Sequence, residues 1–236
     1  MDAQKVAAEV WDSHGDEAYR QDQSHWRGVG RWANDAAWQS IGKGTLINFQ
    51  TLARYLDRPF PTAPSMLEWG PGGGTNLFAF RKIASTYFGI DISAKNLAEA
   101  SRMISAEPDA SVRFMPVLLE TAPADIVGKV SGVDLFLSTA VFQHFPEKAY
   151  GAEVLRVLRS VCVPRAFGII QIRYDNGNPL FKPIATIADY KTRHITANSY
   201  AIDEFNDLAT EAGFRVCYVT DIRSKNNYVT FALEAR

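Results

Sequence analysis

The sequence predicts an α/β fold in which a seven-stranded, mostly parallel sheet carries helices on both faces. Short apolar runs alternate with segments of helical periodicity through most of the chain. Strands that are separated by helices form parallel sheets. The last two strand-like runs, 214–222 and 228–233, have only a turn between them. We therefore expect an antiparallel strand at the C-terminal edge of the sheet.

The expected elements follow from these runs. The strands are expected at 66–69, 87–90, 112–115, 133–137, 167–172, 214–222 and 228–233. Helices are expected from Thr75, over 94–104, from Pro146 to Val161 and over 205–212, where Gly213 stops the last one.

A proline-rich stretch, 57–64, divides the chain because prolines at this density end helices and favour an extended backbone. Residues 1–58 are predicted to be a helical N-terminal extension. This extension contains four of the five tryptophans and is expected to act as a lid that excludes water from the site. The alternative, favoured for most of its Trp and Tyr side chains, is that they form a small hydrophobic core of their own. Residues 65–236 are predicted to form the core domain, with an insertion near 175–198.

Composition narrows the classes of function. A chain of 236 residues suits one α/β domain with a modest extension. The net charge of −1 argues against a large nucleic-acid surface. No long apolar run indicates a membrane span or a signal peptide, so we expect a cytoplasmic protein. The two cysteines, Cys162 and Cys217, are expected to be small buried side chains, and no spacing of residues suggests a metal site.

The strongest local signal is a glycine loop after the first expected strand. Glu68 is followed by glycines at alternate positions, Gly70, Gly72 and Gly74, and then by a helix. Glycines let a ligand approach the backbone, and a helix N-terminus favours anionic groups. Asp91 ends the second strand, and an acid about 20 residues after such a loop typically binds ribose hydroxyls. Together these features predict a cofactor that contains a nucleoside.

The spacing of the glycines argues against two common nucleotide sites. A dinucleotide loop needs a third glycine where Thr75 or Leu77 stands here. A phosphate-binding P-loop would close with Gly-Lys-Ser/Thr, which is absent from this run.

The chain resembles the class I, Rossmann-like, S-adenosyl-L-methionine-dependent methyltransferases over residues 65–236. The resemblance rests on four motifs in order: the acid with alternating glycines, Asp91, the run 133–146 that begins Val-Asp-Leu-Phe-Leu, and a helix–glycine–strand ending at 204–214. It implies that S-adenosyl-L-methionine is the cofactor.

The resemblance also implies roles for individual residues. The backbone of the three glycines would approach the methionyl part, and Glu68 would help to hold its amino group. Asp91 would bind the ribose diol, and Ile92 would lie against adenine. Ser138 or Thr139 would sit beneath the methionine moiety.

The adenine amino group is often held by an acid after the third strand, and the sequence departs from the family there. Apolar residues, Leu118 and Leu119, stand at this position. Adenine is therefore expected to contact these residues and their backbone groups, with Glu120 as an alternative.

Two histidines are candidates for a catalytic base, because an alcohol nucleophile must lose a proton. His144 follows the fourth strand, and His194 lies in the insertion. A structural role is the alternative for both. His14 and His25, in the N-terminal segment, are weaker candidates.

The sequence therefore predicts methyl transfer to a small molecule, with oxygen favoured over nitrogen or carbon as the acceptor atom. An RNA or protein methyltransferase and a nicotinamide-dependent oxidoreductase are the alternatives. Four arginines could hold an anionic acceptor, although such residues more often pair with acids or face solvent: Arg27, Arg31, Arg173 and Arg193.

Overall fold

A computed structural model describes residues 3–13 and 15–236. The chain clusters into two compact units. The N-terminal unit is Trp11–Leu119, and the C-terminal unit joins Glu120–Arg236 to the chain up to Val10. Each unit is described by itself below. The division into an extension at 1–58 and a core domain stays a prediction.

The sheet has seven strands in the order β3-β2-β1-β4-β5-β7-β6. Parallel pairs join β1 to β2, β2 to β3 and β4 to β5, whereas β7 is antiparallel to both β5 and β6. The strands are β1 Ser65–Trp69, β2 Thr86–Asp91, β3 Arg113–Leu118, β4 Val133–Ser138, β5 Cys162–Arg173, β6 Phe214–Arg223 and β7 Tyr228–Ala235. The predicted class I fold is confirmed, including its antiparallel C-terminal strands.

Eight α-helices are found in the described residues, and six short 3₁₀ turns accompany them. The helices are α1 Ala3–Ser13, α2 Glu17–Gln23, α3 Asp35–Tyr55, α4 Thr75–Phe80, α5 Ala94–Ser105, α6 Lys148–Val161, α7 Tyr190–Arg193 and α8 Ile202–Glu211. The expected helical character of the N-terminal segment is thus confirmed. No helix in the described part of the chain is long and apolar enough to cross a membrane.

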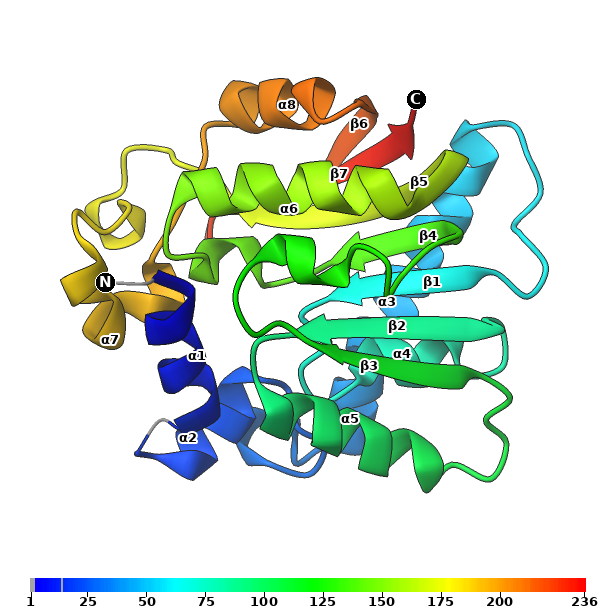
Figure 1. Ribbon diagram of the computed structural model, residues 1–236, viewed down its shortest axis with the longest axis horizontal. Coiled ribbons are helices and arrows are strands. Elements are labelled where there is room, and N and C mark those ends of the chain that lie inside the picture. Colours follow the sequence, from blue (N-terminus) through cyan, green and yellow to red (C-terminus); the bar gives the residue numbers. More distant parts are fainter. Residues whose placement is uncertain (1–2, 14) are drawn as a thin grey trace. The chain divides into compact units, whose positions relative to one another are not determined.

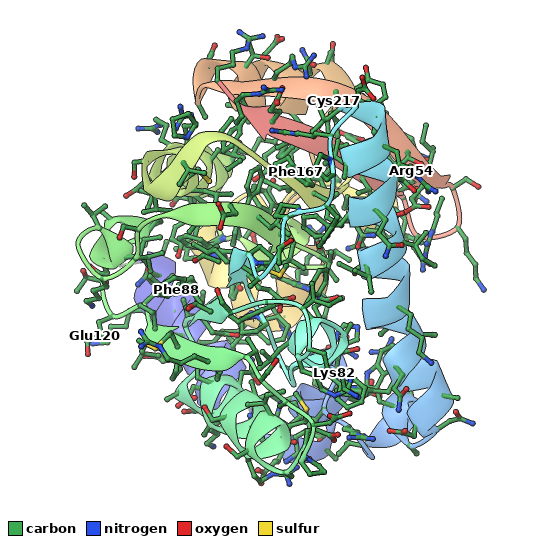
Figure 2. The ribbon with its side chains drawn as sticks, turned by 90° about the vertical axis from the view of Figure 1, so that its right-hand side faces the viewer. Arg54, Lys82, Phe88, Glu120, Phe167 and Cys217 are labelled. Atoms are coloured by element: carbon green, nitrogen blue, oxygen red, sulfur yellow. The ribbon has the colours of Figure 1, made fainter. Side chains whose placement is uncertain are left out.

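In the N-terminal unit, α3 packs closely on α4, which follows the glycine loop (Figure 1). Trp38 and Phe49 on α3 are fully buried, and their rings meet Phe78 and Phe80 of α4 at centroid distances of 5.4 and 5.5 Å. Arg54 stands on the exposed side of the same helix (Figure 2). The buried face of α3 therefore fixes the helix that begins at the glycine loop.

In the C-terminal unit, aromatic side chains link α8 to the sheet. The ring of Phe205 on α8 lies 4.7 Å from Phe231 of β7 and 5.5 Å from Phe142. Phe167 on β5 is buried, whereas Cys217 on β6 is half-buried (Figure 2). The prediction of a buried cysteine is thus confirmed at Cys162 and wrong at Cys217, because β6 is the last strand of the sheet and is covered less completely.

All seven strands extend at least one residue beyond their predicted limits, and β3 and β5 extend furthest. β3 continues through Pro116 to Leu118, and a proline is tolerated because β3 is an edge strand whose outer N–H groups need no partner. β5 starts at Cys162, directly after α6, and Cys162 pairs with Val133 next to an irregularity in register. Pro164 makes this stretch look like a turn in the sequence, and Arg165 next to it has a positive φ of 63°.

Candidate active site

The glycine loop connects β1 to α4 in the N-terminal unit. Gly70, Gly72 and Gly74 have φ values of 78°, 52° and 85°, a region that side-chain-bearing residues rarely adopt. Gly74 is also the N-cap residue of α4. The alternating glycines of the sequence are therefore required by the backbone of this turn.

The N-terminal segment lies directly against this loop. The N–H of Gly73 donates a hydrogen bond of 2.7 Å to the carbonyl oxygen of Ser24. A Cβ atom on Gly72 would lie 2.4 Å from that same oxygen, and one on Gly73 would lie 2.7 Å from the Cα atom of Trp26. The absence of side chains at these glycines therefore lets residues 24–26 pack against the loop. The sequence did not predict this contact.

Two buried polar residues in this segment retain unused hydrogen-bonding groups. Arg20 is 2 % exposed, and among the described residues its Nε and Nη1 atoms have no acceptor. Its Nη2 donates to Glu17 at 3.3 Å. The Oγ atom of Ser24, one turn further along, likewise has no described partner. This pair can bind a carboxylate, and nothing in the local sequence pattern pointed to it.

Glu68 lies at the carboxyl end of β1 and is almost completely buried, at 1 % exposure. Its two oxygens accept hydrogen bonds from Asn76 Nδ2 at 2.5 Å and from the Tyr87 hydroxyl at 2.7 Å. Burial raises the pKa of Glu68 to about 7, although these two hydrogen bonds oppose the shift. The sequence analysis missed both partners.

Asp91 ends β2 and is also buried. It accepts hydrogen bonds from the N–H of Ser93 at 2.8 Å and from Asn96 Nδ2 at 3.4 Å. Burial raises the pKa of Asp91 to about 6 despite these donors. Asn96 in turn accepts a hydrogen bond of 3.0 Å from the indole N–H of Trp26. The segment at 24–26 is therefore connected to both the glycine loop and the predicted ribose-binding acid.

The residues predicted to meet adenine differ in exposure. Ile92 is half-buried and Leu118 is 36 % exposed, so both side chains have accessible surface. Leu119 is buried, and its N–H donates a hydrogen bond of 2.9 Å to the carbonyl of Asp91. Of these residues, Ile92 and Leu118 can offer apolar side-chain surface to a base.

In the C-terminal unit, the other predicted cofactor residues, Ser138 and Thr139, lie at the carboxyl end of β4. Ser138 is the last residue of β4, is fully buried, and pairs with Ile170 of β5. Thr139 comes next, followed by Ala140 in a left-handed conformation with φ 57°. The chain therefore turns sharply at the carboxyl end of β4 and leads into the 3₁₀ turn Phe142–His144.

The two candidate histidines lie together in the C-terminal unit. His144 Nδ1 is 2.8 Å from the carbonyl oxygen of His194, so Nδ1 carries the proton and donates it. The lone pair is then on Nε2, which lies 3.1 Å from Gln143 Nε2. The hydroxyl of Tyr190 donates to the carbonyl of His144 at 2.6 Å. His144 is thus held in one tautomer, whereas His194 is buried and contributes a main-chain oxygen.

The structure describes one of the two weaker histidine candidates. His25 belongs to the N-terminal unit, where burial lowers its pKa to about 4 and its ring lies 4.5 Å from that of Trp32. Its imidazole is therefore uncharged at neutral pH, and the main-chain oxygen of His25 accepts a hydrogen bond from the indole N–H of Trp38. His14 lies outside the described residues.

The predicted insertion lines a pocket of about 300 Å³ in the C-terminal unit. Its walls come from residues 146–148, 183–187 and 197–198. Most of the lining side chains are apolar, whereas Lys148 and Glu147 bring charge to the rim. Lys148 is paired with Glu204 at 2.6 Å.

Comparison with known proteins agrees with this arrangement. Residues 67–162 match the family described as "Methyltransferase domain". No curated protein matches the chain by sequence.

Solved structures resemble the whole chain at low sequence identity. Magnesium protoporphyrin IX methyltransferase from Synechocystis PCC 6803, determined with bound SAM, is 14 % identical with a TM-score of 0.66, and the match covers 100 % of this chain and 98 % of that one. A putative O-methyltransferase from Nostoc punctiforme PCC 73102 is 15 % identical with a TM-score of 0.59, covering 99 % and 72 %. A mitomycin 7-O-methyltransferase is 12 % identical with a TM-score of 0.56, covering 100 % and 68 %.

At these identities the structures establish the fold, while the family match identifies the domain. The match includes Glu68, the glycine loop, Asp91 and His144. The predicted class of enzyme and its cofactor, S-adenosyl-L-methionine, are thereby confirmed. Residues 67–162 match a methyltransferase domain, and the chain has the class I, Rossmann-like fold.

Proposed function

We propose that this protein transfers a methyl group from S-adenosyl-L-methionine to an oxygen atom of a small-molecule acceptor. The glycine loop followed by Asp91 at the end of β2 is the observation that carries the cofactor part of this proposal. The named neighbours that act on small molecules or on oxygen support the acceptor part. The balanced net charge of −1 favours a small molecule over RNA.

The residues of the N-terminal unit suit the functional groups of this cofactor. Asp91 offers a carboxylate to the ribose diol, and Ile92 and Leu118 offer apolar surface to adenine. The backbone of Gly70, Gly72 and Gly74 and the carboxyl group of Glu68 would meet the methionyl part. Ser138 and Thr139, at the end of β4, are proposed to contact the same part of the cofactor.

Arg20 and Ser24 provide hydrogen-bond donors that could bind a carboxylate. The buried guanidinium has two nitrogens without a described acceptor, and the Ser24 hydroxyl is also unused. Arg20 already forms an ion pair with Glu17 at 3.3 Å, but burying its other two nitrogens without acceptors is costly. We assign Arg20 and Ser24 to the carboxylate of the methionyl part. The segment at 24–26 then acts as the predicted lid, because its contacts with the glycine loop and Asn96 would have to open for the cofactor to enter.

His144 is proposed as the base that accepts the proton of an acceptor hydroxyl. S-adenosyl-L-methionine supplies an activated methyl group on a sulfonium, so the protein needs only to align the acceptor, exclude water and take up the proton. The hydrogen bond to the carbonyl of His194 fixes the tautomer of His144 and leaves a lone pair on Nε2. His194 is proposed to position His144 through this carbonyl oxygen, so its role is not that of a base.

Methyl transfer to paired acceptors tests the proposal. The full chain is incubated with methyl-labelled S-adenosyl-L-methionine and with matched phenols and anilines, and with bulk tRNA and a denatured protein mixture in parallel. Label in the phenols with little in the anilines would support transfer to oxygen. Label in the macromolecules alone would replace the small-molecule proposal with one of its alternatives.

A further inference from the structure

Arg173, the last residue of β5, is a buried cation without a described counter-ion. Its exposure is 4 %. Nη1 donates a hydrogen bond of 2.8 Å to the carbonyl of Ile195, and Nη2 donates one of 3.1 Å to the hydroxyl of Tyr228. Among residues 3–13 and 15–236, no group accepts from Nε and no carboxylate forms an ion pair with the guanidinium.

This arrangement is unfavourable in isolation. An arginine side chain is cationic, and burying a charge without a counter-ion is unfavourable. Its two hydrogen bonds go to neutral groups, which do not balance the charge. The two aromatic rings near the guanidinium, Phe181 at 4.7 Å and Tyr228 at 5.1 Å, fix its plane. Arg173 is therefore held in one orientation with one donor unused, as expected of a group that receives an anion.

The same cluster connects Arg173 to the candidate base. Tyr228 accepts hydrogen bonds from Arg173 and from Gln143 Nε2, which is 3.2 Å away, so its own hydroxyl proton remains available to a ligand. Gln143 Nε2 is also 3.1 Å from His144 Nε2. The Oε1 atom of Gln143 is buried and has no described partner. A ligand here would meet a cation, a hydroxyl donor, an amide acceptor and an imidazole.

We propose that Arg173 and Tyr228 bind a carboxylate of the methyl acceptor, which makes the acceptor an organic acid. The carboxylate would accept hydrogen bonds from Arg173 Nε and from the Tyr228 hydroxyl. Gln143 Oε1 can then accept a hydrogen bond from the rest of the acceptor, beside His144 Nε2, which lies 3.1 Å from Gln143 Nε2. Phe181 and Ile195, which contact the guanidinium, come from the predicted insertion at 175–198, so this segment also covers the anion site. The inference rests on the proposed function only in calling the anion a methyl acceptor.

The Nε–H resonance of Arg173 reports directly on the unused donor. The full chain is labelled with ¹⁵N-arginine and saturated with S-adenosylhomocysteine, and the resonance is assigned by its loss in Arg173→Lys. Benzoate is the anionic probe, and benzamide is its neutral counterpart of the same shape. Arg81 Nε, which already donates to Asp109 at 2.7 Å, serves as an internal reference assigned through Arg81→Lys.

Benzoate is expected to move the Arg173 resonance downfield in a saturable way and to leave that of Arg81 in place. Benzamide is expected to move neither. Arg173→Lys should weaken benzoate binding by about tenfold to a hundredfold, as the loss of a charge-assisted hydrogen bond predicts. The wild-type titration does not depend on whether that variant folds.

Three results would overturn the inference: no movement of the Arg173 resonance, equal movement with benzamide, or unchanged benzoate affinity in folded Arg173→Lys. Any of these results would mean that Arg173 has only a structural role, as the donor of the hydrogen bond that links β5 to the Ile195 carbonyl. Calorimetry with S-adenosylhomocysteine separates this failure from that of the proposed function. Cofactor binding without a benzoate response would reject the anion site alone, and a benzoate response without cofactor binding would reject the methyltransferase proposal alone.

Discussion

Two glycines in α3 offer a matched test of how the glycine loop is supported. Gly42 and Gly44 lie in the interior of the same helix, where alanine is more favourable than glycine by about 1 kcal/mol. A Cβ atom on Gly44 would have no neighbour within 4 Å. One on Gly42 would lie 2.4 Å from the carbonyl oxygen of Thr75 and 2.7 Å from the Cβ atom of Ala79. The two substitutions should therefore have opposite effects.

The magnitudes follow from these contacts. Gly44→Ala should raise the free energy of unfolding by about 0.5–1 kcal/mol, because only the helix preference changes. Gly42→Ala gains the same preference but forces α3 away from backbone atoms at the start of α4, and overpacking of this kind costs about 1–3 kcal/mol. Its net effect should be a loss of up to about 2 kcal/mol.

Urea denaturation of both variants beside the wild type measures these changes, and calorimetry with S-adenosylhomocysteine measures their effect on the site. Because Thr75 follows the glycine loop, Gly42→Ala should also weaken cofactor binding, whereas Gly44→Ala should not. Equal stabilisation by both substitutions would refute the reasoning, since it would mean that α3 and α4 do not meet at Gly42.

Three further predictions concern the site itself. Glu68→Gln should remove one part of the pH dependence of stability. The raised pKa of about 7 means that the native state binds this proton more tightly than the unfolded chain does. Glu68 should therefore contribute about 3 kcal/mol to the fall in wild-type stability as the pH rises from 4.5 through 7, beside the contribution of Asp91, whose pKa is also raised. Equal changes in the free energy of unfolding of the variant and the wild type between pH 4.5 and pH 7 would contradict this prediction. Arg20→Met should weaken S-adenosylhomocysteine binding by about tenfold to a hundredfold in calorimetry, while exposed Arg54→Met should leave it unchanged. His144→Asn should lower kcat for a hydroxyl acceptor by about 10²–10⁴-fold with unchanged cofactor affinity, and an unaltered kcat would exclude it as the base.

The sequence predicts the order of strands and helices well, because each element has its own hydrophobic period. The glycine loop and Asp91 were found for a similar reason, since their spacing is local. β3 and β5 were predicted too short because Pro116 and Pro164 resemble the ends of strands. The edge position of β3, which accommodates Pro116, depends on strand order and not on any local residue pattern.

The supporting contacts of the site were not predictable from the sequence. Trp26 meets Asn96 across 70 positions, and Tyr87 meets Glu68 across 19. No periodicity relates such pairs, because only the folded chain brings them together. The unused donors of Arg20 and Arg173 were not predictable for the same reason, since an arginine in a sequence gives no sign of which of its N–H groups will find an acceptor.

Calorimetric titration of the full chain with S-adenosylhomocysteine, and separately with NAD⁺, tests the central claim most directly. The arrangement of Asp91, the glycine loop and Arg20 predicts stoichiometric binding of S-adenosylhomocysteine in the micromolar range and no binding of NAD⁺. Asp91→Asn should weaken the first of these without creating the second. Binding of NAD⁺ in the absence of any affinity for S-adenosylhomocysteine would contradict the assignment of the cofactor and, with it, the proposed methyl transfer.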